Sequence, residues 1–344
     1  MALIIPQNYR NRLLPETTEI AIKMIKDRFQ TSLAEALCLR RVTAPLFVTA
    51  SSGLNDNLNG VERPVSFVAP SIGHDEIQIV HSLAKWKRMK LADYEVAPGY
   101  GLYTDMNAIR ADEELDNLHS LYVDQWDWEQ TILPEQRTTA YLHEVVNKIY
   151  GALKATERMV GDLFPHIKSV LPEKVTFIHA QELLDRYPDL TAKERENEVC
   201  KEYGAVFIQG IGAKLSDGKK HDGRAPDYDD WSTVDESGRV GLNGDLLVWN
   251  PVLQQAFELS SMGIRVSPGS LVNQLEIEGC PERASLPFHK SLIEGRLPLS
   301  IGGGIGQSRL CMFFLQKAHI GEVQSSLWPD EQRAACKKAG IELL

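Results

Sequence analysis

A glycine-rich run near residue 300 places the strongest constraint on the fold of this chain. Residues 301–306 read Ile-Gly-Gly-Gly-Ile-Gly, and an apolar run over 310–315 follows them. Glycine lacks a Cβ, so a ligand can approach the backbone closely and positive φ angles cost little. The apolar run is typical of a buried helix, which would place the glycines at a helix N-terminus. Free N–H groups and the helix dipole favour an anion at such a position.

Arg309 supports this interpretation because its planar donor fork suits phosphate. The run therefore predicts a nucleotide site, and a purely structural turn before a core helix is the alternative. A Walker A loop is excluded, because no Gly-Lys-Ser/Thr sequence follows the glycines. No βαβ pattern follows them either, which argues against a dinucleotide-binding fold.

The overall charge and the cysteines narrow the class of protein further. A net charge of −10 argues against a nucleic-acid-binding protein, which would need a basic face. We expect a soluble, cytoplasmic protein without a membrane span, because neither a signal peptide nor an 18-residue apolar run is found. The five cysteines are widely spaced and form no CxxC motif, which excludes a zinc site or a disulfide framework. Cys38 and Cys311 lie in apolar runs and are expected in the core.

Hydrophobic spacing predicts helices over 18–38, 141–163 and 191–203. Thr17 or Thr18 can cap the first helix, and Thr191 with Glu194 forms a capping box that Gly204 matches as a stop signal. Strands are expected over 39–48, 65–68, 77–80, 121–123, 174–178, 205–209 and 246–249. Pro45 cannot donate to a ladder, so the first of these should lie at a sheet edge or end at a contact with another element. Because the strands cluster, the pattern predicts an α+β fold, a largely antiparallel sheet flanked by helices, as a single domain over 1–344.

The segment 81–88 is dense in charge and is interpreted as a helix. Lys85 and Arg88 form a solvated face in one interpretation. In the other, Lys87 beside Trp86 points into a cleft as a partner for carboxylate or phosphate.

The segment 124–129 alternates acidic and aromatic residues, as a strand would place them on opposite faces. One face would carry Gln125, Asp127 and Glu129 together. Three polar groups are costly in a dry core unless they are paired, so a polar binding face is favoured over a structural network.

The segment 215–231 is rich in charge but lacks the ligand positions of an EF-hand, and an exposed loop is the alternative. It leads towards Asp245 and Glu258, which are hard oxygen ligands of the kind that Mg²⁺ takes beside phosphates. Acidic residues near a proposed triphosphate site make most sense with a bridging metal.

Three motifs taken together resemble the class II aminoacyl-tRNA synthetases. The run 302–309 is similar to their third signature, and Arg40-Arg41-Val42-Thr43-Ala44-Pro45 is similar to their first, a dimer-forming strand that contains proline. Arg110-Ala111-Asp112-Glu113 resembles the second signature, whose arginine grips the α-phosphate.

The resemblance is closer to the ammonia-dependent asparagine synthetases, a synthetase-like family without the tRNA-binding parts. It rests on the runs 81–88, 122–129, 224–233 and 258–265, and it covers about residues 10 to 330. Around 280–296 and in the last dozen residues the similarity is loose, and no role is carried over there.

The resemblance implies an ATP-dependent reaction in which the β-carboxylate of L-aspartate attacks the α-phosphate. This step gives β-aspartyl-AMP and pyrophosphate, and ammonia then releases asparagine and AMP. The implied ATP-binding residues are Arg110, Gly304, Gly306 and Arg309, and the implied Mg²⁺ ligands are Asp245 and Glu258. Lys87 and Arg265 would face the carboxylates of aspartate. Asp56, Ser82, Gln125 and Asp127 would contact its amino group or the ammonia, with Asp229 and Ser261 as further substrate contacts. The catalytic set is then Arg110, Arg309, Asp56, Asp127 and Lys87, in a homodimer.

Two other classes compete with this hypothesis. A tRNA-charging enzyme would need a tRNA-binding module, but few residues precede the first signature and the net charge is acidic. A non-catalytic paralogue is disfavoured because Arg110, Arg309 and Glu258 are all present. A glutamine-dependent synthetase would need an N-terminal cysteine, which Met1-Ala2 does not supply.

Overall fold

The computed structural model describes residues 3–56 and 62–344, and a mixed sheet dominates this part of the chain. The eight strands of the sheet run in the order β1-β5-β6-β11-β10-β9-β8-β7. Their bounds are β1 Leu39–Arg41, β5 Gly101–Ile109, β6 Tyr122–Thr131, β7 Thr176–His179, β8 Ala205–Gln209, β9 Asn243–Asn250, β10 Gln255–Ile264 and β11 Ser300–Gly306. Only the two edge pairs, β1–β5 and β7–β8, are parallel. The prediction of a largely antiparallel α+β fold is therefore confirmed.

A small second sheet lies beside the first. It contains β2 Phe47–Thr49, β3 Ser66–Phe67 and β4 Ile77–Ile79 in the order β2-β4-β3. The strand predicted over 39–48 is thus two strands in two sheets, because Pro45 falls in the connection between them. The edge position predicted for its first part is confirmed, since β1 is the outermost strand of the large sheet.

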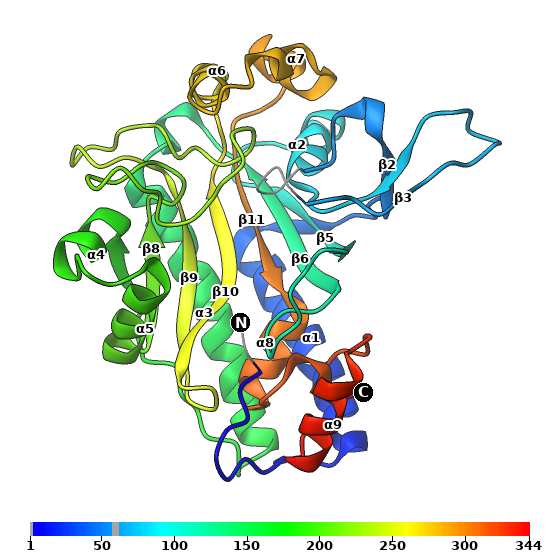
Figure 1. Cartoon of the computed structure of the whole chain (residues 1–344). Helices are drawn as coiled ribbons and strands as arrows, with labels where there is room; N and C mark the ends of the chain where they lie inside the picture. Colours follow the sequence, from blue (N-terminus) through cyan, green and yellow to red (C-terminus); the bar gives the residue numbers. More distant parts are fainter. Residues whose placement is uncertain (1–2, 57–61) are drawn as a thin grey trace.

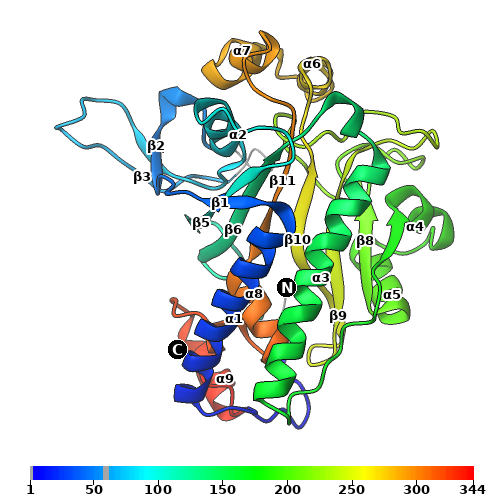
Figure 2. The same cartoon turned by 180° about the vertical axis from the view of Figure 1, so that it is seen from behind.

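Helices cover one face of the large sheet and only part of the other. The helices are α1 Pro15–Leu37, α2 Ala84–Asp93, α3 Thr139–Leu163, α4 Ala180–Arg186, α5 Ala192–Tyr203, α6 Pro268–Ile277, α7 Pro287–Ile293, α8 Gln307–Phe314 and α9 Asp330–Lys338. Figure 2 shows α1 and α3 side by side over one face, where they bury the main core. At the β7–β8 end, α4 packs on β7 and α5 packs on β8, β9 and β10, and a second hydrophobic cluster is buried there. Figure 1 shows the strands between, from β5 to β10, largely uncovered by helices on the side that faces the viewer.

Side chains alternate between the two faces of β6, and this alternation separates the buried core residues from those that line a cavity. Trp126 and Trp128 are fully buried on the α1 side, where Trp126 contacts Phe29 with ring centroids 4.9 Å apart. Gln125 and Asp127 point to the opposite face and line a cavity there. The two-faced strand predicted over 124–129 is confirmed.

The glycine run is a strand whose last residue, Gly306, is also the N-cap of α8. Gly302 to Gly306 pair along their length with β6 and β10, and α8 begins only at Gln307. The N-terminal N–H of Ser308 is already bound by the carboxylate of Asp124 at 3.0 Å. A carboxylate of the chain therefore already lies at this helix end, and the binding of a ligand anion there stays a prediction. The apolar run could not reveal that the glycines themselves pair as a central strand.

Local capping signals gave mixed results. The capping box of Thr191 and Glu194 is confirmed, and Gly204 ends α5 at φ +76°. The cap of α1 is wrong, because the helix begins at Pro15 and Thr18 lies within it. Cys38 is exposed as the left-handed end of α1, which corrects its predicted place in the core, whereas Cys311 is buried as expected. Among the helices of the described residues, none combines the length and the apolar character that crossing a bilayer requires.

Acid is expected to destabilise the fold through His319. This side chain is fully buried, and its Nδ1 accepts the N–H of Gly321 at 3.0 Å, which only an unprotonated nitrogen can do. Burial lowers the pKa of His319 from 6.5 to about 4. Between these values the unfolded chain binds a proton that the folded chain does not, so stability falls as the pH falls through this window, by up to roughly 1.4 kcal/mol per pH unit.

Urea midpoints at pH 7 and pH 5, measured for the wild type and for His319→Gln, test this expectation. The wild type should lose more stability on acidification than the variant. An equal loss in both proteins would contradict it.

Candidate active site

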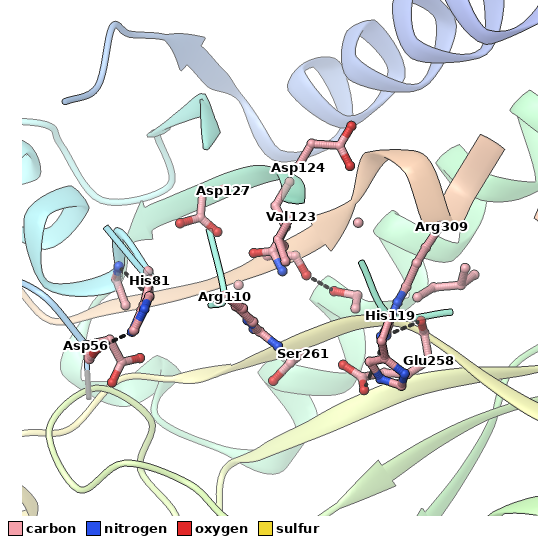
Figure 3. Close-up of a pocket in the computed structure, with 18 of the residues that line it drawn as sticks. Asp56, His81, Arg110, His119, Val123, Asp124, Asp127, Glu258, Ser261 and Arg309 are labelled. Atoms are coloured by element: carbon pink, nitrogen blue, oxygen red, sulfur yellow. Dashed lines mark hydrogen bonds and ion pairs between the residues drawn. The ribbon is translucent and has the colours of Figure 1, made fainter. Parts of the chain in front are cut away.

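A cavity of about 310 Å³ opens on the uncovered face of the large sheet. Its floor is formed by β6, β11 and β10, and its sides by the start of α2 and by residues 222–229. Figure 3 shows side chains from several elements around it, among them Asp127 of β6, Glu258 and Ser261 of β10, and Arg309 of α8. The predicted site residues that line it are Asp56, Ser82, Lys87, Arg110, Gln125, Asp127, Asp229, Glu258, Ser261, Arg265, Gly304, Gly306 and Arg309. Of the predicted set, Asp245 is the one that does not.

The glycines of β11 make room on this floor. Gly302, Gly304 and Gly306 lie directly opposite Glu129, Asp127 and Gln125 of β6, so all six positions share one face. A Cβ on Gly304 would collide with the amide oxygen of Gln125 and lie 2.8 Å from an Asp127 oxygen. None of these glycines has a positive φ. The run is therefore needed for space above the strand and not for a left-handed turn.

Gly304→Ala is expected to lower activity strongly, because the added methyl group pushes Gln125 and Asp127 out of place in the cavity. A misplacement of about 1 Å can cost on the order of 10²-fold in rate. Gly151→Ala is the matched control, since that helical position has open space around it and alanine favours helices. Steady-state rates and urea midpoints of both variants check this prediction. Equal activity of Gly304→Ala and wild type would contradict the proposed role of the floor.

Buried charges support the floor from one end. Arg265 donates to both oxygens of Glu129 at 2.9–3.1 Å and also contacts Asp229. Lys87 lies 3.4 Å from an Asp127 oxygen and 3.8 Å from Glu129. Burial raises the pKa of Asp229, while the neighbouring arginines oppose that change.

This arrangement answers the question that the sequence left open about 125–129. The two alternatives, a polar binding face and a structural network, both occur on one strand. Gln125 and Asp127 line the cavity, and Glu129 is fully buried in a network of paired charges.

The start of α2 carries cations towards the cavity. The helix begins at Ala84, whose N–H donates to the Ser82 hydroxyl at 3.1 Å. Residues 81–83, which were predicted to be helical, therefore lie outside the helix. The N–H of Leu83 donates to Asp127 at 3.3 Å and thereby ties this turn to β6. Lys87 is 1% exposed and donates to the backbone oxygens of Trp128 and Gly303.

Lys85 and Arg88 do not form a solvated face. Lys85 donates to the Asn55 carbonyl at 2.7 Å, and Arg88 donates to the carbonyls of Val266 and Pro298. Both side chains are buried, so they tie α2 to neighbouring loops.

Two arginines reach the cavity from different elements. Arg110 follows β5 and contacts Glu113 at 3.4 Å, while its buried Nε has no hydrogen-bond partner among the described residues. Arg309 lies in the first turn of α8, 3.2 Å from the Glu258 carbonyl and 3.7 Å from its carboxylate. Such loosely held guanidinium groups remain able to bind phosphate oxygens.

The predicted pair of magnesium ligands is only partly assembled. Glu258 lines the cavity, and although burial acts to raise its pKa, Arg309 and Arg224 hold it below the usual value. Asp245 instead binds the guanidinium of Arg224, and burial raises its pKa to about 6. Within residues 3–56 and 62–344 no group of three metal-ligating side chains exists. Glu258 therefore fits a metal held mainly by nucleotide phosphates, whereas Asp245 is paired with Arg224 in this arrangement.

Among the cavity-lining residues that sequence reasoning did not assign to the site are Arg224, His81 and His119. Arg224 donates to Ser261 at 3.0 Å as well as to Asp245, so it forms part of the wall. Its signal was present, because Arg224 and His81 both stand in runs on which the family resemblance rests. His119 had no such signal, since a lone histidine in a loop is most often structural.

Comparison with known proteins supports the resemblance over nearly the whole chain. The family model described as aspartate-ammonia ligase matches residues 16–340, including the stretch around 280–296 where the similarity had looked loose. Aspartate–ammonia ligases of Bacteroides fragilis and Clostridium perfringens are each 59% identical over 342 residues, and each alignment covers 99% of both chains.

Solved structures of similar fold are class II synthetases. The asparaginyl-tRNA synthetase of Pyrococcus horikoshii, complexed with asparaginyl-adenylate, gives a TM-score of 0.66 at 14% identity over 91% of this chain and 70% of that one. The asparaginyl-tRNA synthetase of Entamoeba histolytica gives a TM-score of 0.64 at 14% identity, over 90% of this chain and 67% of that one. At such identity the likeness shows the fold alone. The family match and the full-length identity show more: the chain belongs to the aspartate–ammonia ligase family, built on the catalytic fold of the class II aminoacyl-tRNA synthetases.

Proposed function

We propose that this chain amidates L-aspartate with ammonia at the expense of ATP, through a β-aspartyl-adenylate, and releases AMP and pyrophosphate. The observation that carries the proposal is the convergence of Arg110 and Arg309 on one cavity that Lys87, Asp127 and Gln125 also line. The arginines suit a triphosphate. The mixed acidic and basic groups suit a zwitterionic amino acid.

The first step brings two anions together, which sets the main electrostatic demand. The aspartate carboxylate must approach the α-phosphate of ATP against charge repulsion. Arg110 and Arg309 would neutralise the phosphates and stabilise the charge that develops in the transition state. The backbone of Gly304 and Gly306 would lie beneath the nucleotide. A magnesium ion held by Glu258, with Asp245 released from Arg224, would supply further charge neutralisation.

The substrate amino acid would lie between α2 and the buried charge network. Lys87 and Arg265 would face its carboxylates, and Asp229 and Ser261 would complete this wall. Asp56, Ser82, Gln125 and Asp127 would contact its amino group or the incoming ammonia. Fixed geometry matters here, because alignment of the reactants can lower the activation barrier by roughly 7–11 kcal/mol.

We further propose a single catalytic domain over 1–344 that acts in the cytoplasm as a homodimer. Neither nucleic acid nor a membrane is expected as a partner, since the net charge is −10. The exposed edge strand β1 is a suitable dimer-forming element, because the backbone groups along its outer side belong to the sheet edge.

The test is AMP release from ATP and Mg²⁺ with aspartate, with and without ammonium, in the absence of tRNA. Ammonium-dependent formation of AMP and asparagine is expected. Aspartate-dependent exchange of pyrophosphate into ATP without any product from ammonium would instead indicate an adenylating enzyme with another acceptor. Absence of both reactions would refute the proposal.

A further inference from the structure

His81 is fixed at the wall of the cavity by its neighbours. It follows β4, is 3% exposed and lines the cavity beside Asp56. Its backbone N–H and that of Asp56 both donate to the Asn55 side-chain oxygen, at 2.8 and 3.0 Å. Asn55 is itself held by a hydrogen bond to the carbonyl of Ile79 at 3.2 Å. The ring therefore has a defined position and not a range of positions.

The hydrogen bonds of His81 determine which of its ring nitrogens is free to accept. Nδ1 lies 3.2 Å from the backbone oxygen of Asp56, and a carbonyl oxygen can only accept, so Nδ1 carries the hydrogen. Burial lowers the pKa of His81, which keeps the ring neutral near pH 7. In the neutral ring Nε2 then bears a lone pair and no hydrogen.

This Nε2 has no hydrogen-bond partner within the described part of the chain, although it is buried. Buried polar atoms are almost always hydrogen-bonded, so an orphan acceptor in a cavity wall calls for a ligand. Figure 3 shows the ring close to Asp56 and near Arg110, whose charge acts on it. If Arg110 binds the α-phosphate, the acyl carbon attached to that phosphate would lie at this end of the cavity.

We propose that His81 is a catalytic residue of the second half-reaction, in which Nε2 accepts a hydrogen bond from the incoming ammonia and then its proton. The inference rests on the proposed function and adds a residue to it. An unprotonated acceptor suits ammonia, which has hydrogen atoms to donate, and it does not suit a phosphate oxygen, which has none.

The proton balance of the step requires one acceptor. The ammonia nitrogen bonds to the β-acyl carbon of the adenylate and becomes positively charged in the tetrahedral intermediate. One N–H proton passes to His81 Nε2. The carbon–oxygen bond to AMP then breaks, AMP leaves with the electron pair, and asparagine remains. His81 returns its proton to solvent before the next turnover.

Two substitutions separate the parts of this role. Asn in His81→Asn replaces Nδ1 with an amide that can still reach the Asp56 carbonyl, and it leaves nothing at the Nε2 position. Gln in His81→Gln reaches the Nε2 position with an amide oxygen, which accepts a hydrogen bond but is not a base. The exposed His74 supplies the control His74→Gln.

Three reactions are measured for each protein. They are aspartate-dependent pyrophosphate exchange without amine, asparagine formation from ammonia, and hydroxamate formation from hydroxylamine. When hydroxylamine adds to the acyl carbon, the positively charged nitrogen of the intermediate is far more acidic than the one formed from ammonia. The reaction with hydroxylamine therefore depends less on a base supplied by the protein.

His81→Asn is expected to keep exchange near the wild-type rate and to lower ammonia-dependent kcat/KM by about 100-fold, the usual size of a general-base contribution. The decrease in kcat/KM of His81→Asn with hydroxylamine should be at least several-fold smaller than its decrease with ammonia. His81→Gln should recover the KM for ammonia more than kcat, and the control should match the wild type.

Equal losses in all three reactions would assign His81 a structural role and overturn the inference. Unchanged ammonia-dependent activity of His81→Asn would overturn it as well. A wild-type protein that shows exchange but forms no asparagine would instead refute the ammonia acceptor of the proposed function, so the two failures are distinguishable.

Discussion

Arg110→Ala is expected to reduce kcat by about two to three orders of magnitude and to leave the fold intact. The loss of one donor to a developing charge typically costs 10²–10³-fold in rate. Stability should change little, because the ion pair of this side chain with Glu113 is long at 3.4 Å. Arg110→Lys should recover only part of the rate, since lysine keeps the charge but loses the planar donor fork.

The matched control is Arg186→Ala, which removes an exposed arginine that is paired with Glu202 and does not line the cavity. Steady-state kinetics with ATP, aspartate and ammonium, together with a thermal unfolding scan, measure both effects. An Arg110→Ala enzyme with wild-type kcat and wild-type KM for ATP would contradict the phosphate role.

Glu129→Ala is expected to cost the largest amount of stability, roughly 3–5 kcal/mol in the free energy of unfolding. Removing one member of a buried charge pair leaves the others uncompensated, and costs of this size are typical. Glu129 is fully buried and accepts hydrogen bonds from Arg265 and from Ser300 at 2.7 Å. Lys87 would keep only Asp127 as a nearby anion.

Urea unfolding of Glu129→Ala beside Glu202→Ala gives the comparison. Glu202 is paired with Arg186 on the surface, where such pairs contribute at most about 1 kcal/mol. If the two variants unfold at the same urea concentration, the network around Arg265 does not stabilise the protein as argued.

The face of β6 that carries chemistry could be predicted from the sequence, because strand alternation is a local property. Gln125 and Asp127 were assigned to one face and the two tryptophans to the other, and both assignments hold. Capping of α5 was predictable for the same reason, since Thr191 and Glu194 are three residues apart and interact directly. The composition of the cavity wall followed from long sequence runs that the family resemblance singled out.

Other features depend on partners that are distant in sequence. Asp245 looked like a free metal ligand, but the fold brings Arg224 against it, 21 residues earlier in the chain. A solvated face was one of two interpretations of Lys85 and Arg88, yet both side chains donate to backbone carbonyls of segments distant in sequence. No pattern along one segment reports which residue of another segment will meet it.

The glycine run shows which features the sequence determines and which only the tertiary structure determines. The sequence by itself determined that something must approach this backbone closely, because four glycines in five positions remove every side chain that would prevent it. Only the tertiary structure decided what approaches. β11 pairs with β6 in the register that sets Gly302 opposite Glu129 and Gly304 opposite Asp127. Register is a relation between two strands, fixed by the packing of a whole sheet, and a single segment does not contain it.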